Sequence, residues 1–438
     1  MAIAHKLDCP HGNWWFLPWH RAFLGWFEQT CRQLSGDPEF ALPYWDWTAT
    51  PRVPDQLFSD VLTPTNELFI ADFAEFKRRF EGPVSQMRCW TAEYDVDGAF
   101  NANSQYALLL DRGLRTPADL WFDIGSDPRW KLFFDRQHAR GLTRDRPDLD
   151  EPTKKTVELP ALLEALAPRD FVTFASPKTF AHSSITGFGT LEGRAHNRVH
   201  NCVGGVFTHN GHSSNSGGFM QENLSPVDPI FFLHHANIDR LWDLWTRKQQ
   251  ANRYPTLPDG YLTPDIQTPR PTDYKLWSDE RLLFFVDSQG EPVTKNRASD
   301  YAAIGDFDYD YEPGSGHAEL LGPEAESTPT PVAFITVDFP RGHSETLHVL
   351  VNAPDDASWT ENDPHHAGEL TMFGHHTMCG PVTFAVPLAR TLAAIRRTAI
   401  VDPNAPVNVR VVARPSGSAH FALHTAAALE ARIIVEMR

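Results

Sequence analysis

The residues that most clearly suggest chemistry are His196 and His200. Side chains four positions apart lie on one face of a helix, so two imidazoles at this spacing can bind the same metal ion. Because the chain has 20 His among 438 residues, about one such pair is expected by chance. A second pair, His420 and His424, has no ligand pattern around it. The first pair differs because His235 follows at the end of the segment Asp228-Pro-Ile-Phe-Phe-Leu-His-His.

A second histidine cluster lies near the N-terminus and contains His5, His11 and His20. Pro18 suits the first position of a helix, and apolar residues follow it at helical spacing. We therefore expect His20 in the first turn of this helix, His11 in the preceding loop and His5 in a short segment at the N-terminus. Taken alone, these residues fit a metal site and a solvated loop equally well.

Six imidazoles without a carboxylate form a nitrogen-only ligand set, which suits copper, zinc or iron. Spacing does not choose among these metals. A dinuclear zinc hydrolase is disfavoured, because no carboxylate ligand is present to help form a hydrolytic nucleophile.

The composition predicts a globular protein with one large and one smaller domain. Aromatic residues make up 12% of the chain, including 13 Trp and 29 Phe, which suits a core around a buried cofactor. The net charge of −17 argues against nucleic acid or an anionic membrane as a partner. No segment reads as a membrane span or a signal peptide. We expect a cytoplasmic location by default, with export alongside a partner left open; a homo-oligomer is compatible with the sequence.

The five cysteines are few and widely spaced, which argues against a disulfide framework. They are Cys9, Cys31, Cys89, Cys202 and Cys379.

The fold class that we predict is mainly α, with a helical-bundle catalytic domain at 1–311 and a β-sandwich at 332–438. A segment rich in Gly, Pro, Glu, Ser and Thr, 312–331, reads as a linker. Amphipathic helices are expected at 67–80 and 156–166. Short β-type runs are expected at 333–339, 346–351, 380–386, 408–413 and 432–436.

Several other histidines are not read as metal ligands. His209 and His212 lie in a polar loop. The doublets His365-His366 and His375-His376, with Cys379 nearby, lack a closed ligand spacing.

Two long motifs resemble the copper signatures of the tyrosinase and polyphenol oxidase family. The first is Cys9-Pro-His-Gly-Asn-Trp-Trp-Phe-Leu-Pro-Trp-His-Arg21, followed by Phe27-Glu28. The second combines His196-x-x-x-His200 with the segment that ends at His235. Two further segments also resemble the family, Leu42-Pro-Tyr-Trp-Asp-Trp47 and Tyr309-Asp-Tyr311, so the resemblance covers about residues 5–311.

The resemblance implies a binuclear copper site. His5, His11 and His20 would hold the first copper ion, and His196, His200 and His235 the second. Family members usually have a helix before the first ligand, which here is residue 5, so His5 is the ligand that we expect to be held most loosely.

The resemblance also implies roles for residues around the ligands. His234 would point about 100° away from His235 on the same helix and would lie behind the ligands, as would Asp239. Cys9, two residues before His11, would form a thioether bond with that histidine.

The implied activity is that of a phenol oxidase that uses O2 on small phenolic substrates. It would hydroxylate monophenols to o-diphenols and oxidise o-diphenols to o-quinones. In the family, a glutamate and an asparagine help to deprotonate the monophenol, and Glu192 and Asn197 match them. The alternative is that Glu192 caps the helix and Asn197 is solvated. A strict catechol oxidase, an o-aminophenol oxidase and a hemocyanin-like dioxygen carrier remain alternatives.

The C-terminal sandwich would cover the copper site, as related domains do in several family members. Met372 and Phe373 are the candidates for a side chain that occupies the phenol position.

Overall fold

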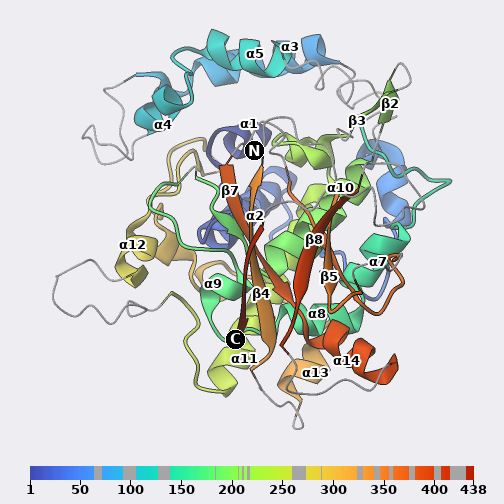
Figure 1. Ribbon diagram of the computed structural model, residues 1–438. Helices are drawn as coiled ribbons and strands as arrows, with labels where there is room; N and C mark the ends of the chain where they lie inside the picture. Colours follow the sequence, from blue (N-terminus) through green and yellow to red (C-terminus); the bar gives the residue numbers. More distant parts are fainter. Residues whose placement is uncertain are drawn as a thin grey trace.

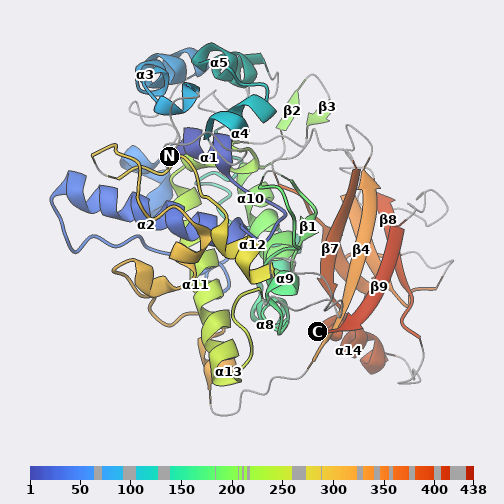
Figure 2. The same ribbon diagram turned by 90° about the vertical axis from the view of Figure 1, so that its left-hand side faces the viewer.

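A helical body and a smaller β-sandwich form the two main parts of the molecule (Figures 1 and 2). The computed structural model describes residues 1–63, 72–91, 105–126, 139–182, 184–205, 207–209, 212–214, 218–258, 273–287, 289–322, 329–339, 346–354, 359–373, 380–398, 406–414 and 431–438. The predicted fold class, mainly helical with a C-terminal β-sandwich, is confirmed.

Two long helices, α2 (Phe16–Ser35) and α11 (Ile230–Ala251), form the centre of the helical body. Both contribute to a large aromatic core that includes Trp19 and Trp242. The shorter helices α1 (Ala2–Asp8) and α10 (Asn197–Gly204) lie next to them, and a π-helix (Leu191–His196) leads directly into α10. These elements carry all of the candidate ligand histidines except His11, which lies in the loop between α1 and α2. His20 is the fifth residue of α2, so its predicted place in the first turn is wrong.

The predicted helix at 156–166 is two helices, α7 (Glu151–Val157) and α8 (Leu159–Ala165). Glu158 between them has an extended backbone, with φ −62° and ψ 154°. In an unbroken helix, Pro160 could not donate to the carbonyl of Thr156, and its ring would clash there. The proline instead begins a new helix.

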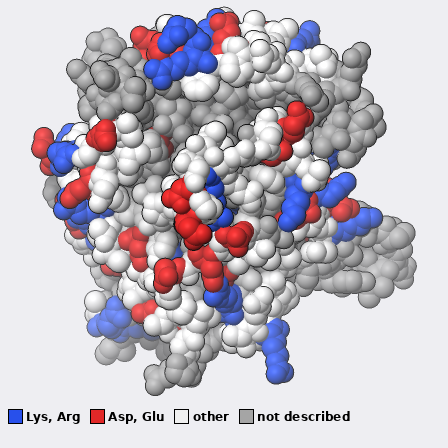
Figure 3. Space-filling view, turned by 180° about the vertical axis from the view of Figure 1, so that it is seen from behind, with Lys and Arg blue, Asp and Glu red and all other residues white. Residues whose placement is uncertain are grey.

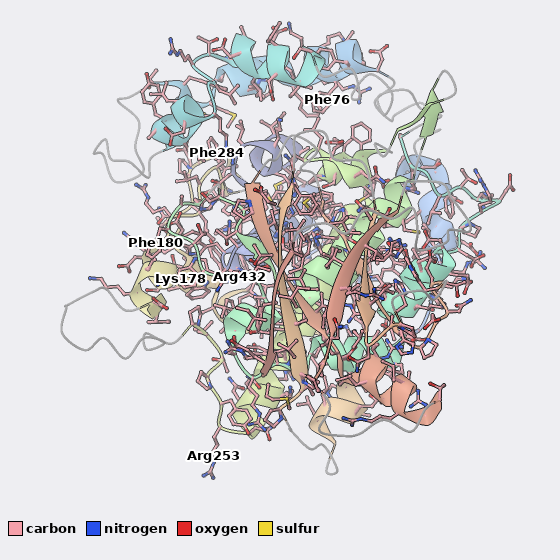
Figure 4. The ribbon with its side chains drawn as sticks, viewed as in Figure 1. Phe76, Lys178, Phe180, Arg253, Phe284 and Arg432 are labelled. Carbon is pink, nitrogen blue, oxygen red and sulfur yellow. The ribbon has the colours of Figure 1, made fainter. Side chains whose placement is uncertain are left out.

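A separate layer of helices covers α1 at the top of Figure 1. It consists of α3 (Phe73–Ser85), α4 (Gln105–Asp111) and α5 (Pro117–Ser126). A second hydrophobic cluster joins this layer to the body and includes Leu7, Phe76 and Phe284, the last two of which are labelled in Figure 4. The helix predicted at 67–80 corresponds to α3, but its first part lies outside the described residues.

A buried ion pair fastens the two central helices together. Arg21 on α2 donates to Asp239 on α11 at 2.7 Å, and the hydroxyl groups of Tyr309 and Tyr311 donate to the other oxygen of Asp239. Removing one member of such a buried pair typically costs about 3–5 kcal/mol. The Tyr309-Asp-Tyr311 motif therefore attaches the end of the helical body to its two central helices through Asp239.

The C-terminal part contains two sheets with strand orders β1-β7-β4-β9 and β6-β5-β8, in which β1 is Gly187–Phe188. The strands are β4 (Pro331–Phe339), β5 (Thr346–Val351), β6 (His366–Leu370), β7 (Gly380–Pro387), β8 (Val409–Arg414) and β9 (Ala431–Met437). All five predicted strands are confirmed, whereas β6 and helix α14 (Ala389–Thr398) were not predicted.

One strand of the larger sheet comes from the helical body. Strand β1 (Gly187–Phe188) pairs in parallel with β7, with Phe188 opposite Phe384. Phe188 is fully buried in the core of the sandwich. The two parts of the molecule therefore share a sheet and a hydrophobic core.

Helix α13 (His317–Leu321) lies inside the predicted linker and contacts α11. Within the described residues, the other regular elements are α9 (Phe171–Phe174), α12 (Asp273–Asp279), β2 (Phe207–His209) and β3 (His212–Ser214), with short 3₁₀ segments at 55–58, 60–62, 88–90, 219–221, 225–227, 298–301 and 304–306.

Figure 3 shows acidic side chains gathered near the middle of the face seen from behind. No helix in the described part of the chain has the length and apolar character needed to cross a bilayer.

Candidate metal centre

The first histidine group combines one side chain from α1, one from the loop after it and one from α2. The ring centroids of His5, His11 and His20 lie 5.4–5.8 Å from one another. All three side chains are buried. His5 lies on a helix, and its Nδ1 bonds to the carbonyl of Asn223 at 2.7 Å, so the structure places it firmly.

The second group comes from α10, the π-helix before it and α11. The rings of His196 and His200 are 4.5 Å apart, and those of His200 and His235 are 5.2 Å apart. The Nε2 atoms of His200 and His235 face each other at 3.0 Å. Nitrogens that converge in this way fit a metal ion between them.

The two groups face each other and form one site. The rings of His20 and His235 stack at 4.3 Å, and those of His11 and His196 at 5.6 Å. Phe16, at the start of α2, lies between the groups, with its ring 4.6 Å from His20 and 4.7 Å from His196.

The hydrogen bonds behind the rings fix the tautomers of several histidines. In His5, His20 and His200, Nδ1 lies 2.7–2.8 Å from a backbone carbonyl, of Asn223, Phe16 and Met220 respectively. A carbonyl only accepts, so each Nδ1 carries the hydrogen and each Nε2 keeps its lone pair. Metal-binding histidines are typically oriented by such bonds.

Burial keeps these imidazoles neutral. It lowers the pKa of His5 to about 3 and lowers the pKa values of His20, His196, His200 and His235 well below the ordinary value. The neutral form is the one that binds a metal. The buried Nε2 atoms of His5 and His196 also lack a hydrogen-bond partner, so the donor set fits a pair of metal ions.

His234 was predicted to point about 100° away from His235 and to lie behind the ligands, but its ring lies close to two of them. Its ring is 5.4 Å from His196 and 4.7 Å from His200. The indole nitrogen of Trp47 lies 3.2 Å from His234 Nδ1. Because an indole N–H only donates, Nδ1 of the neutral ring accepts and the hydrogen stands on Nε2. This tautomer has no lone pair on Nε2 to offer a metal.

Cys9 lies between two histidines of the first group. Its Sγ is 3.5 Å from His11 Nδ1 and 3.7 Å from His11 Nε2. The ring carbon between these two nitrogens, Cε1, is therefore the part of His11 that faces the sulfur. Sγ also lies 3.4 Å from Nε2 of His20.

Glu192 is fully buried in the π-helix and reaches back to the loop that carries His11. Its Oε1 accepts from the backbone N–H of Gly12 at 2.8 Å, and the Ser176 hydroxyl bonds to Oε2. Gly12 has φ +62°, and a Cβ there would approach Ile185 to 2.4 Å. Burial raises the pKa of Glu192 well above its ordinary value, against the opposing effect of these hydrogen bonds. Its carboxylate does not cap α10.

The model of the common central domain of tyrosinase matches residues 2–248. The chain belongs to the tyrosinase family. It is 30% identical over 274 residues to the tyrosinase of Streptomyces antibioticus, covering 62% of this chain and 76% of that protein. It is likewise 30% identical over 271 residues to grixazone synthase of Streptomyces griseus, covering 59% of this chain and 74% of the relative.

A solved structure extends the similarity in fold to almost the whole chain. The recombinant latent aurone synthase, a polyphenol oxidase, aligns with 98% of this chain and 77% of its own chain, with a TM-score of 0.54 and 16% identity. Relatives of this tyrosinase-family protein are named as oxidoreductases of phenols, and the family is one of coupled binuclear copper proteins.

In this tyrosinase-family chain, two asparagines of α10 connect the site to the sandwich. The side-chain oxygen of Asn197 accepts from His196 Nδ1 at 2.8 Å, and its NH₂ group donates to the carbonyl of Thr371 at 2.7 Å. Asn201 donates to the carbonyl of Met372 at 3.0 Å. Asn197 is therefore buried and fully engaged rather than solvated.

The segment held by these asparagines places Phe373 over the histidines. The ring of Phe373 is fully buried and lies 4.2 Å from His200, 4.8 Å from His11 and 5.7 Å from His196. Met372 packs against the sandwich core instead. Of the two candidates, Phe373 is the one at the metal centre.

Sequence reasoning missed the groups that orient the ligands. Asn223 and Met220 act through backbone carbonyls, which carry no sequence signal, and Ser176 is far from Glu192 in the chain. Asn201 was overlooked, although it lies four residues after Asn197 and therefore on the same helical face. His209 and His212 lie in β2 and β3, whose side chains are not described, while His375, His376, Cys379, His420 and His424 fall outside the described residues.

Proposed function

We propose that the protein is a copper-dependent phenol oxidase that uses O2 to hydroxylate monophenols to o-diphenols and to oxidise o-diphenols to o-quinones. One observation carries this proposal: two groups of three buried imidazoles face each other, with His20 and His235 stacked at 4.3 Å. Family membership supports copper as the metal.

The first copper ion would be held by His5, His11 and His20, and the second by His196, His200 and His235. When bound, the copper pair supplies the dioxygen and electron-transfer chemistry. The chain orients the imidazoles, excludes water and controls access of the phenol. His234 and Asp239 act behind the ligands, His234 through Trp47 and Asp239 through Arg21.

A metal and activity assay tests this assignment. The copper-loaded protein should contain two copper ions per chain and turn catechol into a coloured quinone. His200→Ala should lose one copper ion and essentially all oxidation, with the helical circular dichroism signal unchanged. Full oxidase activity in this variant would overturn the assignment, and reversible dioxygen binding without turnover would instead identify a dioxygen carrier.

Glu192 is the group that we propose as the base for monophenols. A phenol has a pKa near 10 and must reach copper as phenolate, and a positioned base typically contributes about 10²–10⁴-fold. Burial raises the pKa of Glu192, which makes it a stronger base than an exposed glutamate. Asn197 supports the same site by orienting His196.

Two substrates separate this role from a structural one. Glu192→Gln keeps an oxygen that can accept from Gly12 but removes the base, so monophenol hydroxylation should fall by about 10² or more while catechol oxidation changes much less. Glu164→Gln on α8 is the matched control, because this buried glutamate accepts from the backbone N–H of Arg390 and from the guanidinium of Arg194, and does not bond to the loop that carries His11. An equal loss on both substrates with a lower melting temperature would assign Glu192 a structural role. A wild-type protein without monophenol activity would be a strict catechol oxidase.

A further inference from the structure

A second group of metal-ligand side chains lies in the sandwich, away from the copper site. His348 on β5 and Glu369 on β6 are direct partners in the antiparallel register, so their side chains project from the same face of the sheet. Glu361, in the turn before β6, joins them. One ligand atom from each of the three residues lies within 4.8 Å of the others.

This face of the sheet points away from the sandwich core. Leu347, Val349 and Val351 of β5 pack into that core, whereas His348 alternates with them and faces the helical body. The His348 side chain is nevertheless buried. A buried imidazole next to two carboxylates is unusual on a sheet that otherwise packs through apolar groups.

The distances within the group suit a small divalent cation. His348 Nδ1 lies 4.0 Å from Glu369 Oε1 and 3.1 Å from Nε2 of His366. With bonds of about 2.0–2.2 Å, ligand atoms of a tetrahedral zinc site stand roughly 3.3 Å apart. His348 Nδ1 and His366 Nε2 lie within hydrogen-bond distance of each other, and the carboxylates of Glu361 and Glu369 lie beside this pair.

The two oxygens of Glu369 have separate surroundings. Oε2 forms an ion pair with Arg198 on α10, whereas Oε1 is the oxygen that faces His348. Arg198 therefore holds the carboxylate in place from the helical body and leaves one oxygen for a cation. Trp359 fixes the imidazoles, with its ring 4.8 Å from His348 and stacked 5.5 Å from His366.

A cavity between the sandwich and the helical body gives access to this group. It has a volume of about 700 Å³, and Glu361, His366, Glu369, Lys155 and Arg198 are among the residues that line it. The cavity is large enough for an ion to enter and for water to complete its coordination.

We propose that His348, Glu361 and Glu369 bind one divalent cation of the zinc class, with His366 or water as a further ligand. This site is independent of the copper pair and of the phenol chemistry. Because β6 ends at Leu370, three residues before Phe373, a bound cation also fixes the strand that leads to the covering side chain.

Zinc uptake by the copper-loaded full chain tests the proposal. Equilibrium dialysis against Zn²⁺ followed by metal analysis should give one zinc ion per chain beyond an unchanged copper content. His348→Ala and Glu361→Gln should each weaken zinc binding by at least about tenfold and leave copper unchanged. His365→Ala is the matched control, because the Nδ1 of this neighbouring histidine bonds to the carbonyl of Val351 instead.

No zinc uptake by the wild-type protein would overturn the proposal, and so would equal zinc binding by wild-type and Glu361→Gln protein. Glu361 is partly exposed in a turn, so its substitution decides the matter even where His348→Ala fails to fold. Loss of copper in step with zinc uptake would show that zinc enters the copper site, which would also overturn it.

Discussion

The neighbours of each histidine decide what its imidazole can do. His234 and His235 are adjacent in the chain and both buried, yet Trp47 donates to Nδ1 of His234 while Nε2 of His235 faces His200. The hydrogen bond from Trp47, more than 180 residues away in the chain, therefore makes His234 a supporting residue, while His235 is free to act as a ligand. The resemblance to the second copper signature of the family identified His235 as the ligand, whereas the tautomer of His234 depends on this tertiary contact.

The position of Cys9 leads to a prediction about covalent chemistry. Because Sγ lies nearly equally far from both nitrogens of His11, we expect a thioether bond between Sγ and the ring carbon between them. Mass spectrometry of a digest of the copper-loaded protein should show the two residues in a crosslinked peptide that has lost two hydrogens. Cys202, whose Sγ accepts a hydrogen bond from the backbone N–H of Asp150, should remain uncrosslinked and serves as the comparison. An alkylated Cys9 in uncrosslinked peptides would contradict the prediction.

His182 supports the loop between the first two ligands. Burial alone would lower its pKa, but Asp8 and Glu280 outweigh this effect and raise it to about 10. The imidazolium therefore links Asp8, at the end of the helix α1 that carries His5, to Glu280, the residue after α12. His182→Asn leaves Asp8 buried without its counter-charge, so we expect a loss of about 3–5 kcal/mol in the free energy of unfolding and weaker copper binding at the first site.

The pH dependence of this loss has a definite sign. A folded pKa of about 10 against an ordinary value of 6.5 means that the contribution of His182 is fully present below 6.5 and disappears as the pH rises towards 10. Denaturation of wild-type and His182→Asn protein at pH 7 and pH 10 should therefore show a smaller difference at the higher pH. His317→Asn, on the surface helix α13, serves as the control, and a difference independent of pH would contradict this account.

At the level of elements, local patterns predicted most of the architecture. The five predicted strands are rich in β-branched or aromatic residues, whereas β6 contains His366-Ala-Gly-Glu-Leu370 and has none. Its pairing with β5 comes from the tertiary structure. Pro160 is a sequence signal for the break between α7 and α8, but the apolar residues on both sides keep a helical spacing, which led to the prediction of one continuous helix.

Helix α10 has two functions because its faces differ. One face presents His200 to the metal centre, and Asn197 and Asn201 on another hold the segment that carries Phe373. Phe373→Ala should therefore raise kcat/KM for catechol by on the order of tenfold. The substitution removes contacts that favour the covered state of the metal centre, and each 1.4 kcal/mol lost from that state raises the fraction of uncovered protein about tenfold.

A neighbouring residue gives the matched control for this prediction. Met372→Ala removes a side chain that packs towards the sandwich core and should leave catechol oxidation nearly unchanged, although it lowers stability. Measurement of both variants with catechol and with a bulkier diphenol shows whether access is the quantity that changed. Equal kcat/KM values for wild-type and Phe373→Ala protein would show that the ring does not limit entry.

On the scale of the whole molecule, the sandwich and the helical body meet at the metal centre, where Phe373 lies over the histidines. The sequence predicted the two parts and the composition change between them, but it gave no sign that β1 crosses from one part to the other, because Gly187 and Phe188 form a strand of only two residues. Short pairings of this kind depend on the partner strand rather than on local propensity.

Separation of the two parts should expose the metal centre. We expect the isolated helical body, obtained by proteolysis within 312–331 and removal of the sandwich, to oxidise catechol faster than the intact chain, because Phe373 leaves with the sandwich. Specific activity of the purified fragments, with copper content measured alongside, checks this. Unchanged activity after complete separation would assign the sandwich to stability or assembly alone.

Because the two parts share a sheet, cleavage of the 312–331 segment alone should not release the sandwich from the helical body. After cleavage we expect β7 to stay paired with β1 and Phe188 to stay in the sandwich core. The cleaved domain should therefore remain bound and keep Phe373 over the metal centre. The intact tether holds it at an effective concentration that is roughly millimolar, whereas the cleaved domain rebinds only as strongly as the protein concentration permits. The cleaved protein should therefore show low catechol oxidase activity at high protein concentration and higher specific activity after dilution. Addition of the isolated domain in excess should lower the activity again.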